Sequence, residues 1–202
     1  VSLVMIKYMG KSSLGLGYAV AFSDLVLSPF MPSNTARSAG TIYPVASNIP
    51  LIFDSTPEHE PRKLGAYISW VAIATTCVTS SMFLTALAPN LLAVDLINKG
   101  TGHMISWGAW ASIMLPLMIP LFLLTPWLVY VVYPPTQKTS PEAPAWAAEE
   151  LKKLGGITSK ELLMAGLAVV ALALWIFSKD FGIDSTTTAI SIVSIMVLAN
   201  VI

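Results

Sequence analysis

Charged residues are scarce in this chain of 202 residues. Only 11% of its positions are Asp, Glu, Lys or Arg, whereas an ordinary soluble domain has about 25%. The 11 basic and 11 acidic side chains give a net charge of zero, so the composition indicates no nucleic-acid partner. Because apolar residues fill 55% of the positions and the mean hydropathy is +0.72, we expect lipid to be the solvent of this protein.

Cysteine and histidine are also nearly absent. The single Cys77 lies in an apolar stretch, which excludes an internal disulfide and a cysteine metal site. His59 and His103 both fall in expected loops, and no nucleophile or metal-binding motif accompanies them. A membrane-embedded enzyme would need a catalytic set that this sequence lacks. We therefore expect no enzyme and no cofactor other than, at most, sodium ions.

No methionine begins the chain. It starts at Val1 and stops at Ile202 inside an apolar run, so we expect a piece of a longer protein. In a piece, the lack of a signal peptide carries no information about location.

Several apolar runs of about 18 to 28 residues match the roughly 20 residues that cross a hydrocarbon core. They predict an all-α polytopic membrane protein without a soluble domain. The expected order is an interfacial amphipathic end (1–13), a re-entrant hairpin of two half-length arms (14–53), a broken transmembrane helix (64–97), a transmembrane helix (105–133), a polar loop with a surface helix (136–160) and two further transmembrane helices (161–178 and 183–202).

Basic residues fall unevenly on the two sides of this threading. Only Lys99 and Lys179 lie on one side, and the more basic side should be cytoplasmic, together with the loop 136–160. The basic residues expected on that cytoplasmic side are Lys7, Lys11, Arg62, Lys63, Lys138, Lys152, Lys153 and Lys160.

Three small polar residues, Ser33, Asn34 and Thr35, separate the two arms of the hairpin just before an expected helix start near Ala36. A helix N-terminus presents unpaired N–H groups and the positive end of its dipole, which attract an anion. Transporters place such N-termini at mid-membrane against substrate carboxylates. We therefore predict a carboxylate site here. The alternative is that one of these side chains simply caps the helix.

Arg37 is a basic residue that the threading places inside the membrane. An arginine at that depth is costly and usually faces the interior of the helix bundle. It would balance the negative charge of a bound carboxylate, so we predict Arg37 as a further substrate-binding residue. The alternative is an internal ion pair with Asp24 on the preceding arm.

Hydroxyl and amide groups gather in the middle of the broken span, where we expect the helix to unwind. Freed carbonyls and these side chains would coordinate a hard cation such as sodium. Packing of small residues between helices is the alternative. The residues concerned are Ser80, Ser81, Thr85 and Asn90, with Ser33 and Asn34 on the other side of the expected cation.

The run from Gly17 to Pro44, which contains the tripeptide Ser-Asn-Thr, closely resembles the divalent anion/sodium symporter family. Within that family it is most similar to bacterial citrate/succinate and tartrate/succinate antiporters and to chloroplast 2-oxoglutarate/malate translocators. The similarity extends over nearly the whole chain, through SSMFLTALAPNLLA (80–93), ISWGAW (105–110), VYVVYPP (129–135) and LWIFSKDFGIDSTTTAI (174–190).

The resemblance implies a homodimeric elevator transporter in a bilayer, such as the bacterial inner membrane, with two inverted repeats in each protomer. It implies that Ser33, Asn34 and Thr35 touch substrate carboxylates or a first sodium ion, and that the loop from Ser80 to Asn90 completes that cation site. A second Ser-Asn-Thr hairpin, which the family requires, does not occur in these 202 residues.

The sequence therefore predicts half of an inverted-repeat transporter that exchanges di- or tricarboxylates of the succinate, malate, 2-oxoglutarate, citrate or tartrate type. Sodium-coupled symport is the alternative within transport. It is less favoured than exchange, because the glycine-rich loop that the resemblance implies for sodium-coupled members is replaced here by SSMFLTALAPN (80–90). A purely structural membrane subunit is less favoured, since it would have no use for Arg37 beside a polar break.

Overall fold

The computed structural model describes residues 1–177, 181–182 and 185–200. Within these residues the regular structure is helical and contains no β-strand, which confirms the all-α prediction. Lys179 and most of the link expected over 178–182 lie outside the described residues.

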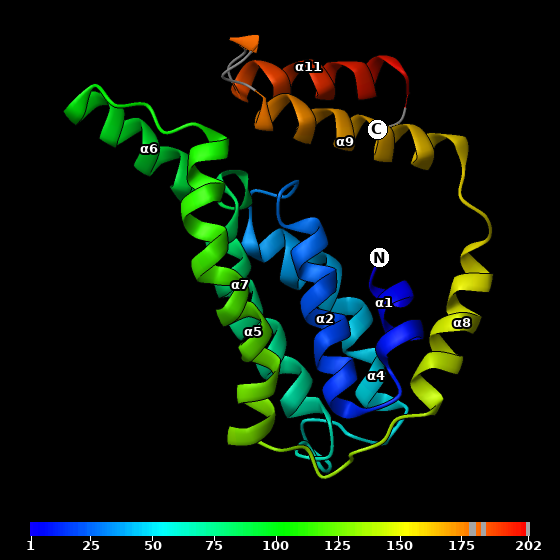
Figure 1. The fold of residues 1–202 in the computed structure, drawn as a ribbon. Helices are drawn as coiled ribbons and strands as arrows, with labels where there is room; N and C mark the ends of the chain where they lie inside the picture. The colour runs from blue at the N-terminus through cyan, green and yellow to red at the C-terminus, as the bar shows by residue number, and fades with distance from the viewer. Residues whose placement is uncertain (178–180, 183–184, 201–202) are drawn as a thin grey trace.

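The described helices differ widely in length, from a single turn to 26 residues. They are α1 (Ser2–Met9), α2 (Ser13–Leu27), the π-helix η1 (Thr35–Ile42), α3 (Tyr43–Ala46), α4 (Asn48–Leu51), α5 (Gly65–Met82), the 3-10 turn η2 (Leu84–Ala86), α6 (Ala88–Thr101), α7 (Trp107–Val132), α8 (Glu142–Leu154), α9 (Ser159–Ile176) and α11 (Ser185–Leu198). Figure 1 shows α2, α5 and α7 as one bundle. The α9 and α11 pair lies across one end of this bundle, and α6 extends outward from the same end.

A helical hairpin forms the first part of the bundle. α2 begins where the Ser12 side chain caps its first turn, and it ends at Leu27, shortly before Pro29. The chain then turns and returns beside α2 through η1, α3 and α4 (Figure 1). Pro44 and Pro50 have no N–H group to donate, so the returning arm consists of short helical pieces rather than one continuous helix.

The span expected to be broken is interrupted between Met82 and Ala88. α5 ends at Met82, η2 forms a single tight turn, and α6 begins with Pro89 in its first turn. Proline is favoured at that position because the first N–H groups of a helix have no partner within it. Extended backbone at Phe83 and Leu87 separates the three pieces.

α2 and α5 approach each other closely at Gly17. A Cβ atom at this position would lie 2.1 Å from the hydroxyl oxygen of Tyr67 on α5. Tyr67 is fully buried, and its hydroxyl donates to the carbonyl oxygen of Pro126 on α7 at 3.2 Å. One glycine thus allows three helices to meet around a single tyrosine.

We expect the Gly17→Ala substitution to lower the free energy of unfolding by about 1–3 kcal/mol, because the added methyl group overpacks this crossing. Gly166→Ala on α9 is the matched control, since a Cβ there meets nothing within 4 Å. The control should be neutral or slightly stabilising, because alanine favours a helix over glycine. Thermal unfolding of the detergent-purified protein measures both, and equal midpoints for the two variants would contradict the close crossing.

Two helices among the described residues, α7 and α9, are long and apolar enough to cross a membrane. The 26 residues of α7 extend about 39 Å, more than the roughly 30 Å of a hydrocarbon core. α7 carries three interior prolines, at Pro116, Pro120 and Pro126. Large apolar side chains such as Ile113 and Leu117 are more than half exposed (60% and 63%). Such a surface is unfavourable in water and suits contact with lipid.

The segment 136–140, which follows α7, is fastened to two distant parts of the chain. Four backbone hydrogen bonds to these parts are 3.0–3.1 Å long, and they run from Thr136 N to Arg62 O, from Gln137 N to Lys63 O, from Ser13 N to Lys138 O and from Ser140 N to Lys11 O. This segment therefore joins the starts of α2 and α5 at the end of the bundle away from α9 and α11 (Figure 1).

α8 is an amphipathic helix that lies beside α1 (Figure 1). Ala143 and Ala147 on one face are fully buried in the core that also contains Ile6 of α1. Lys153 on the other side is exposed, and its ammonium group donates to Glu150 at 2.6 Å. That hydrogen bond raises the pKa of Lys153, so this surface of α8 stays charged.

Candidate functional site

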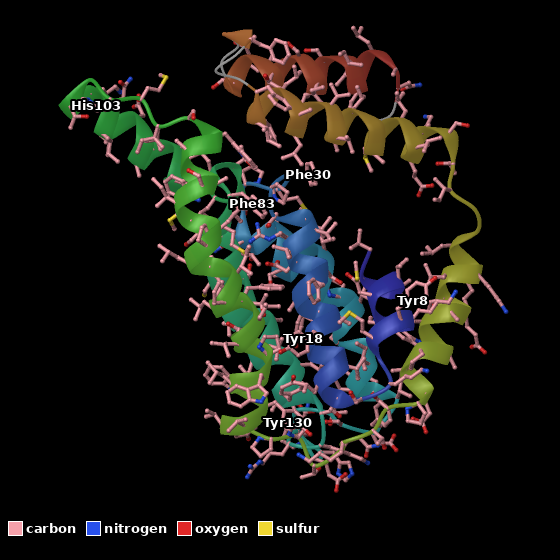
Figure 2. All side chains as sticks on the ribbon, in the orientation of Figure 1. Tyr8, Tyr18, Phe30, Phe83, His103 and Tyr130 are labelled. Carbon is pink, nitrogen blue, oxygen red and sulfur yellow. The ribbon has the colours of Figure 1, made fainter. Side chains whose placement is uncertain are left out.

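The hairpin tip (residues 32–36) and the helix break (residues 83–87) meet at one end of the bundle. The amide of Ala88 donates to the carbonyl oxygen of Pro32 at 3.1 Å. Figure 2 shows Phe30, just before the tip, and Phe83, in the break, at this same end of the molecule. The two polar features that the sequence analysis expected on either side of one cation are thus adjacent in space, and together they form the candidate site.

The three polar residues of the tip differ in their surroundings. The Ser33 hydroxyl accepts a hydrogen bond from Ala36 N at 3.3 Å, so the capping alternative holds for Ser33. Asn34 is half-buried, whereas Thr35 is exposed and its side chain has no hydrogen-bond partner in the described part of the chain. η1 begins at this tip. The N–H groups of Ala36 and Arg37 donate to Ser33, whereas that of Thr35 has no acceptor among the described residues. Donors are therefore available here for an anion.

Arg37 lies directly beneath the tip and is completely buried (0% exposed). Its Nε donates to Asp24 Oδ1 at 2.9 Å, and the hydroxyl of Thr79 donates to the second oxygen of the same carboxylate. The sequence left two roles open for Arg37, substrate binding and an ion pair with Asp24, and the structure contains the ion pair. A guanidinium without exposed surface makes no direct contact with a substrate in this conformation.

The remaining donors of Arg37 hold the tip to the break. Its Nη1 donates to the carbonyl oxygens of Met31 and Ala86, at 3.0 and 3.1 Å. Its Nη2 donates to hydroxyl groups on α5, including those of Thr76 and Ser80, both at 3.3 Å. A planar guanidinium suits this task because its five N–H groups point in fixed and different directions.

Several carbonyl groups that unwinding frees at the break already have protein donors. The Asn90 side-chain amide donates to the carbonyl oxygens of Ser80 and Phe83, at 2.8 and 3.2 Å. The Trp110 indole donates to the carbonyl oxygen of Ser81 at 3.1 Å. A sodium ion would have to compete with these donors for the oxygens that the sequence offered as its ligands. No group of three or more His, Cys, Asp and Glu suited to a metal ion occurs among the described residues.

Trp107 fixes the middle of the break. Its indole donates to the Thr85 hydroxyl at 3.3 Å, and that hydroxyl donates in turn to the carbonyl oxygen of Pro29 at 2.7 Å. The Trp107 ring also stacks on Phe83, with 5.9 Å between ring centroids. Sequence reasoning missed this role. A signal for this role was present in the sequence: Trp107 and Trp110 are at positions i and i+3 of a helix, which puts both indoles on one side of its start.

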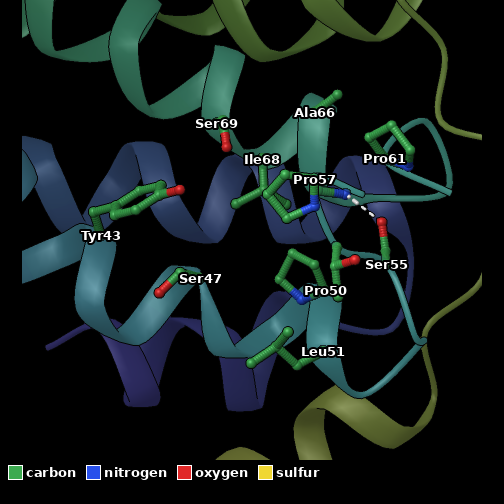
Figure 3. A pocket seen from close by; sticks show the side chains of 12 residues that line it. Tyr43, Ser47, Pro50, Leu51, Ser55, Pro57, Pro61, Ala66, Ile68 and Ser69 are labelled. Atoms are coloured by element: carbon green, nitrogen blue, oxygen red, sulfur yellow. Dashed lines mark hydrogen bonds between the residues drawn. The ribbon is translucent and has the colours of Figure 1, made fainter. Parts of the chain in front are cut away.

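A cavity of about 490 Å³ lies between the returning arm of the hairpin and the start of α5 (Figure 3). It contains the hydroxyl groups of Tyr43, Ser47 and Ser69, but none of its lining residues is charged. The Ser55 hydroxyl at its edge accepts a hydrogen bond from Gly65 N at 3.0 Å. This cavity is lined by residues 43–69, far along the arm from the tip, so we assign no carboxylate to it.

A second cavity, of about 470 Å³, lies beside the tip and reaches α9 and α11. Its lining is largely apolar and includes Pro29, Phe30, Ala171 and Ile192, with Thr85 at the break. Asn34 and Thr35 are not among the residues that line it.

The chain is similar to known membrane transporters over its whole length. The family described as the sodium:sulfate symporter transmembrane region matches residues 1–202. L-tartrate/succinate antiporters from Escherichia coli strain K12 and from Shigella flexneri are each 47% identical to it over 203 aligned residues. The alignments cover 100% of this chain and 42% of each relative, so the chain spans less than half of their length.

Proposed function

Because this chain belongs to the sodium:sulfate symporter family, we propose that it works in a secondary transporter that exchanges di- or tricarboxylates across the membrane. The family and the relatives are transporters, a symporter and antiporters by name, and not enzymes. The chain is accordingly an integral membrane protein of the inner-membrane type. L-tartrate and succinate, which appear in the names of the relatives, are the first substrates to test.

The observation that carries this proposal is the set of donors at the tip. Asn34 and Thr35 offer a side-chain amide, a hydroxyl and the N-terminus of η1, and no carboxylate of the described chain is bonded to them. Hydrogen bonds to charged groups contribute about 1.5–3 kcal/mol each, so several such donors favour a carboxylate. The site suits recognition of an anion rather than chemistry on it.

The hydrogen bonding at the helix break favours exchange without sodium over sodium symport. The carbonyl oxygens of Ser80, Ser81 and Phe83 accept hydrogen bonds from the protein, which lowers their availability to a cation. Arg37 contributes less than its charge suggests, because Asp24 neutralises it. The hypothesis that its free charge balances the substrate gives way to one in which Arg37 positions the tip. Sodium-coupled uptake remains the second candidate, because the matching family is named for sodium.

We infer further that the hairpin is re-entrant and that the chain forms one repeat of an elevator transporter that assembles as a homodimer. The hairpin shape, the break at the same end of the bundle and the exposed apolar faces of α7 and α9 fit this arrangement. In such a carrier, the polar loop 136–160 faces the cytoplasm and a second repeat supplies the other half of the carboxylate site.

The test is labelled succinate uptake by the complete protein reconstituted in liposomes. We expect uptake only into vesicles preloaded with succinate or L-tartrate, with less than a twofold change when potassium replaces sodium. Uptake into empty vesicles under a sodium gradient would favour symport instead. If no dicarboxylate moves in either experiment, the proposed function is wrong.

A further inference from the structure

We propose that Ser80 is a positioning residue that turns the amide of Asn34 so that its NH₂ group faces the carboxylate substrate. This inference rests on the proposed function and names the residue that sets the selectivity of its site for anions. The sequence offered Ser80 as a ligand for a cation or as a small residue in helix packing.

The contact is short, and it is enclosed on the side of Ser80. Ser80 lies in the last turn of α5 and is 3% exposed, and its hydroxyl oxygen is 2.5 Å from Asn34 Oδ1. Asn34 is the residue from which η1 starts, so this hydrogen bond joins the tip to α5 by side chains alone. Because the oxygen and nitrogen of a primary amide diverge from one carbon, fixing Oδ1 against Ser80 turns Nδ2 away from it.

A hydroxyl group carries one proton, and a second acceptor competes for it, since the carbonyl oxygen of Thr76 is also within hydrogen-bond distance of Ser80 Oγ. If Thr76 held the proton, the amide of Asn34 would reverse and donate to Ser80. Arg37 decides between these states, because its Nη2 lies 3.3 Å from the same hydroxyl. Although Asp24 balances the net charge of Arg37, the N–H groups of Nη2 point at this hydroxyl, so the neighbouring amide is favoured with its oxygen rather than its NH₂ group on the side of the guanidinium. Arg37 thus acts on Asn34 through Ser80.

The outcome decides which ion the tip recognises. In this orientation Nδ2 of Asn34 has no partner in the described part of the chain, and its two N–H groups are free to donate to a carboxylate. In the reversed orientation the tip would present an amide oxygen, which is a ligand for a hard cation and unfavourable toward a carboxylate. One serine on a neighbouring helix therefore selects an anion over a cation.

The test is a set of succinate exchange measurements on the complete protein in liposomes. We expect Ser80→Ala to raise the KM for succinate about tenfold, as for one lost hydrogen bond to a charged group, with Vmax within twofold. Ser80→Thr keeps the hydroxyl and should restore a KM near that of the wild type. Ser80→Cys keeps the size but donates weakly, so its KM should be intermediate. Ser69→Ala, on the same helix, is the control and should leave KM unchanged.

A double-mutant cycle separates positioning from a general structural effect. Since Ser80 acts through Asn34, adding Ser80→Ala to Asn34→Ala should change KM by less than twofold. A further tenfold rise in the double variant, or a wild-type KM in both Ser80→Ala and Ser80→Cys, would overturn the inference. These results differ from failure of the proposed function, in which the wild type itself exchanges no dicarboxylate. If Ser80→Ala does not fold, the KM values of Ser80→Cys and of its double variant with Asn34→Ala test the inference in the same way.

Discussion

Replacing Arg37 with glutamine is expected to abolish transport and to lower the free energy of unfolding by about 3–5 kcal/mol. The substitution leaves the Asp24 carboxylate buried without its counter-ion, and it removes donors from the carbonyl oxygens of Met31 and Ala86. Arg37→Lys should not restore function, because one ammonium group cannot reach acceptors that lie in several directions. Thermal unfolding of the purified protein and succinate exchange in liposomes measure the two effects.

A matched control and a double variant sharpen this test. Lys99→Gln breaks the exposed pair with Asp95, whose side chains are 71% and 49% exposed, and should change stability by less than about 1 kcal/mol. Adding Asp24→Asn to Arg37→Gln removes the unpaired charge, so the double variant should be more stable than Arg37→Gln alone. Equal stability of Arg37→Gln and Lys99→Gln would show that the buried pair is not what holds the tip to the break.

Loss of Asn34 or Thr35 is expected to damage recognition while leaving the fold intact. Each substitution to alanine removes a donor to a partly desolvated anion, which costs about 1–3 kcal/mol, or roughly a 5- to 150-fold rise in the KM for succinate. Stability should change little, because Thr35 is exposed and Asn34 is only half-buried. The effect is measured by the exchange kinetics of both variants, with equal amounts of protein in the liposomes.

Ser47→Ala is the control for this prediction. Ser47 lines the 490 Å³ cavity along the returning arm, away from the tip, and its loss should not alter the KM. A rise in KM for Ser47→Ala with unchanged values for Asn34→Ala and Thr35→Ala would move the carboxylate site from the tip to that cavity.

Local patterns were sufficient for the parts of the fold that depend on neighbouring residues. The lack of charge and the length of the apolar runs predicted an all-helical chain, and the polar residues before Arg37 marked a helix start that lies at Thr35. Pro89 and the hydroxyl groups before it marked the region where α5 ends and α6 begins. Each of these features is decided by backbone chemistry within a few residues, so a sequence displays it directly.

Contacts between distant residues could not be decided in the same way. Asp24 and Arg37 offered an ion pair, but the choice between that pair and a substrate depends on burial, which the sequence does not show. The link from Trp107 to Thr85 joins residues 22 positions apart across a change of helix direction. The π-helical geometry of η1, which follows the tip, also has no distinct composition to reveal it.

The segment 136–140 constrains evolution differently from an ordinary surface loop. Four hydrogen bonds from this segment to the starts of α2 and α5 use main-chain atoms on both sides, so most of its side chains can vary. Ser140 is the exception, because it is fully buried and its hydroxyl donates to the carbonyl oxygen of Gly10 at 2.7 Å. The length of the segment is constrained, because one inserted residue would move its main-chain atoms out of line with their hydrogen-bond partners at Arg62 and at Ser13. Natural variation at this connection should therefore accumulate as substitutions and avoid insertions and deletions, although most loops tolerate both.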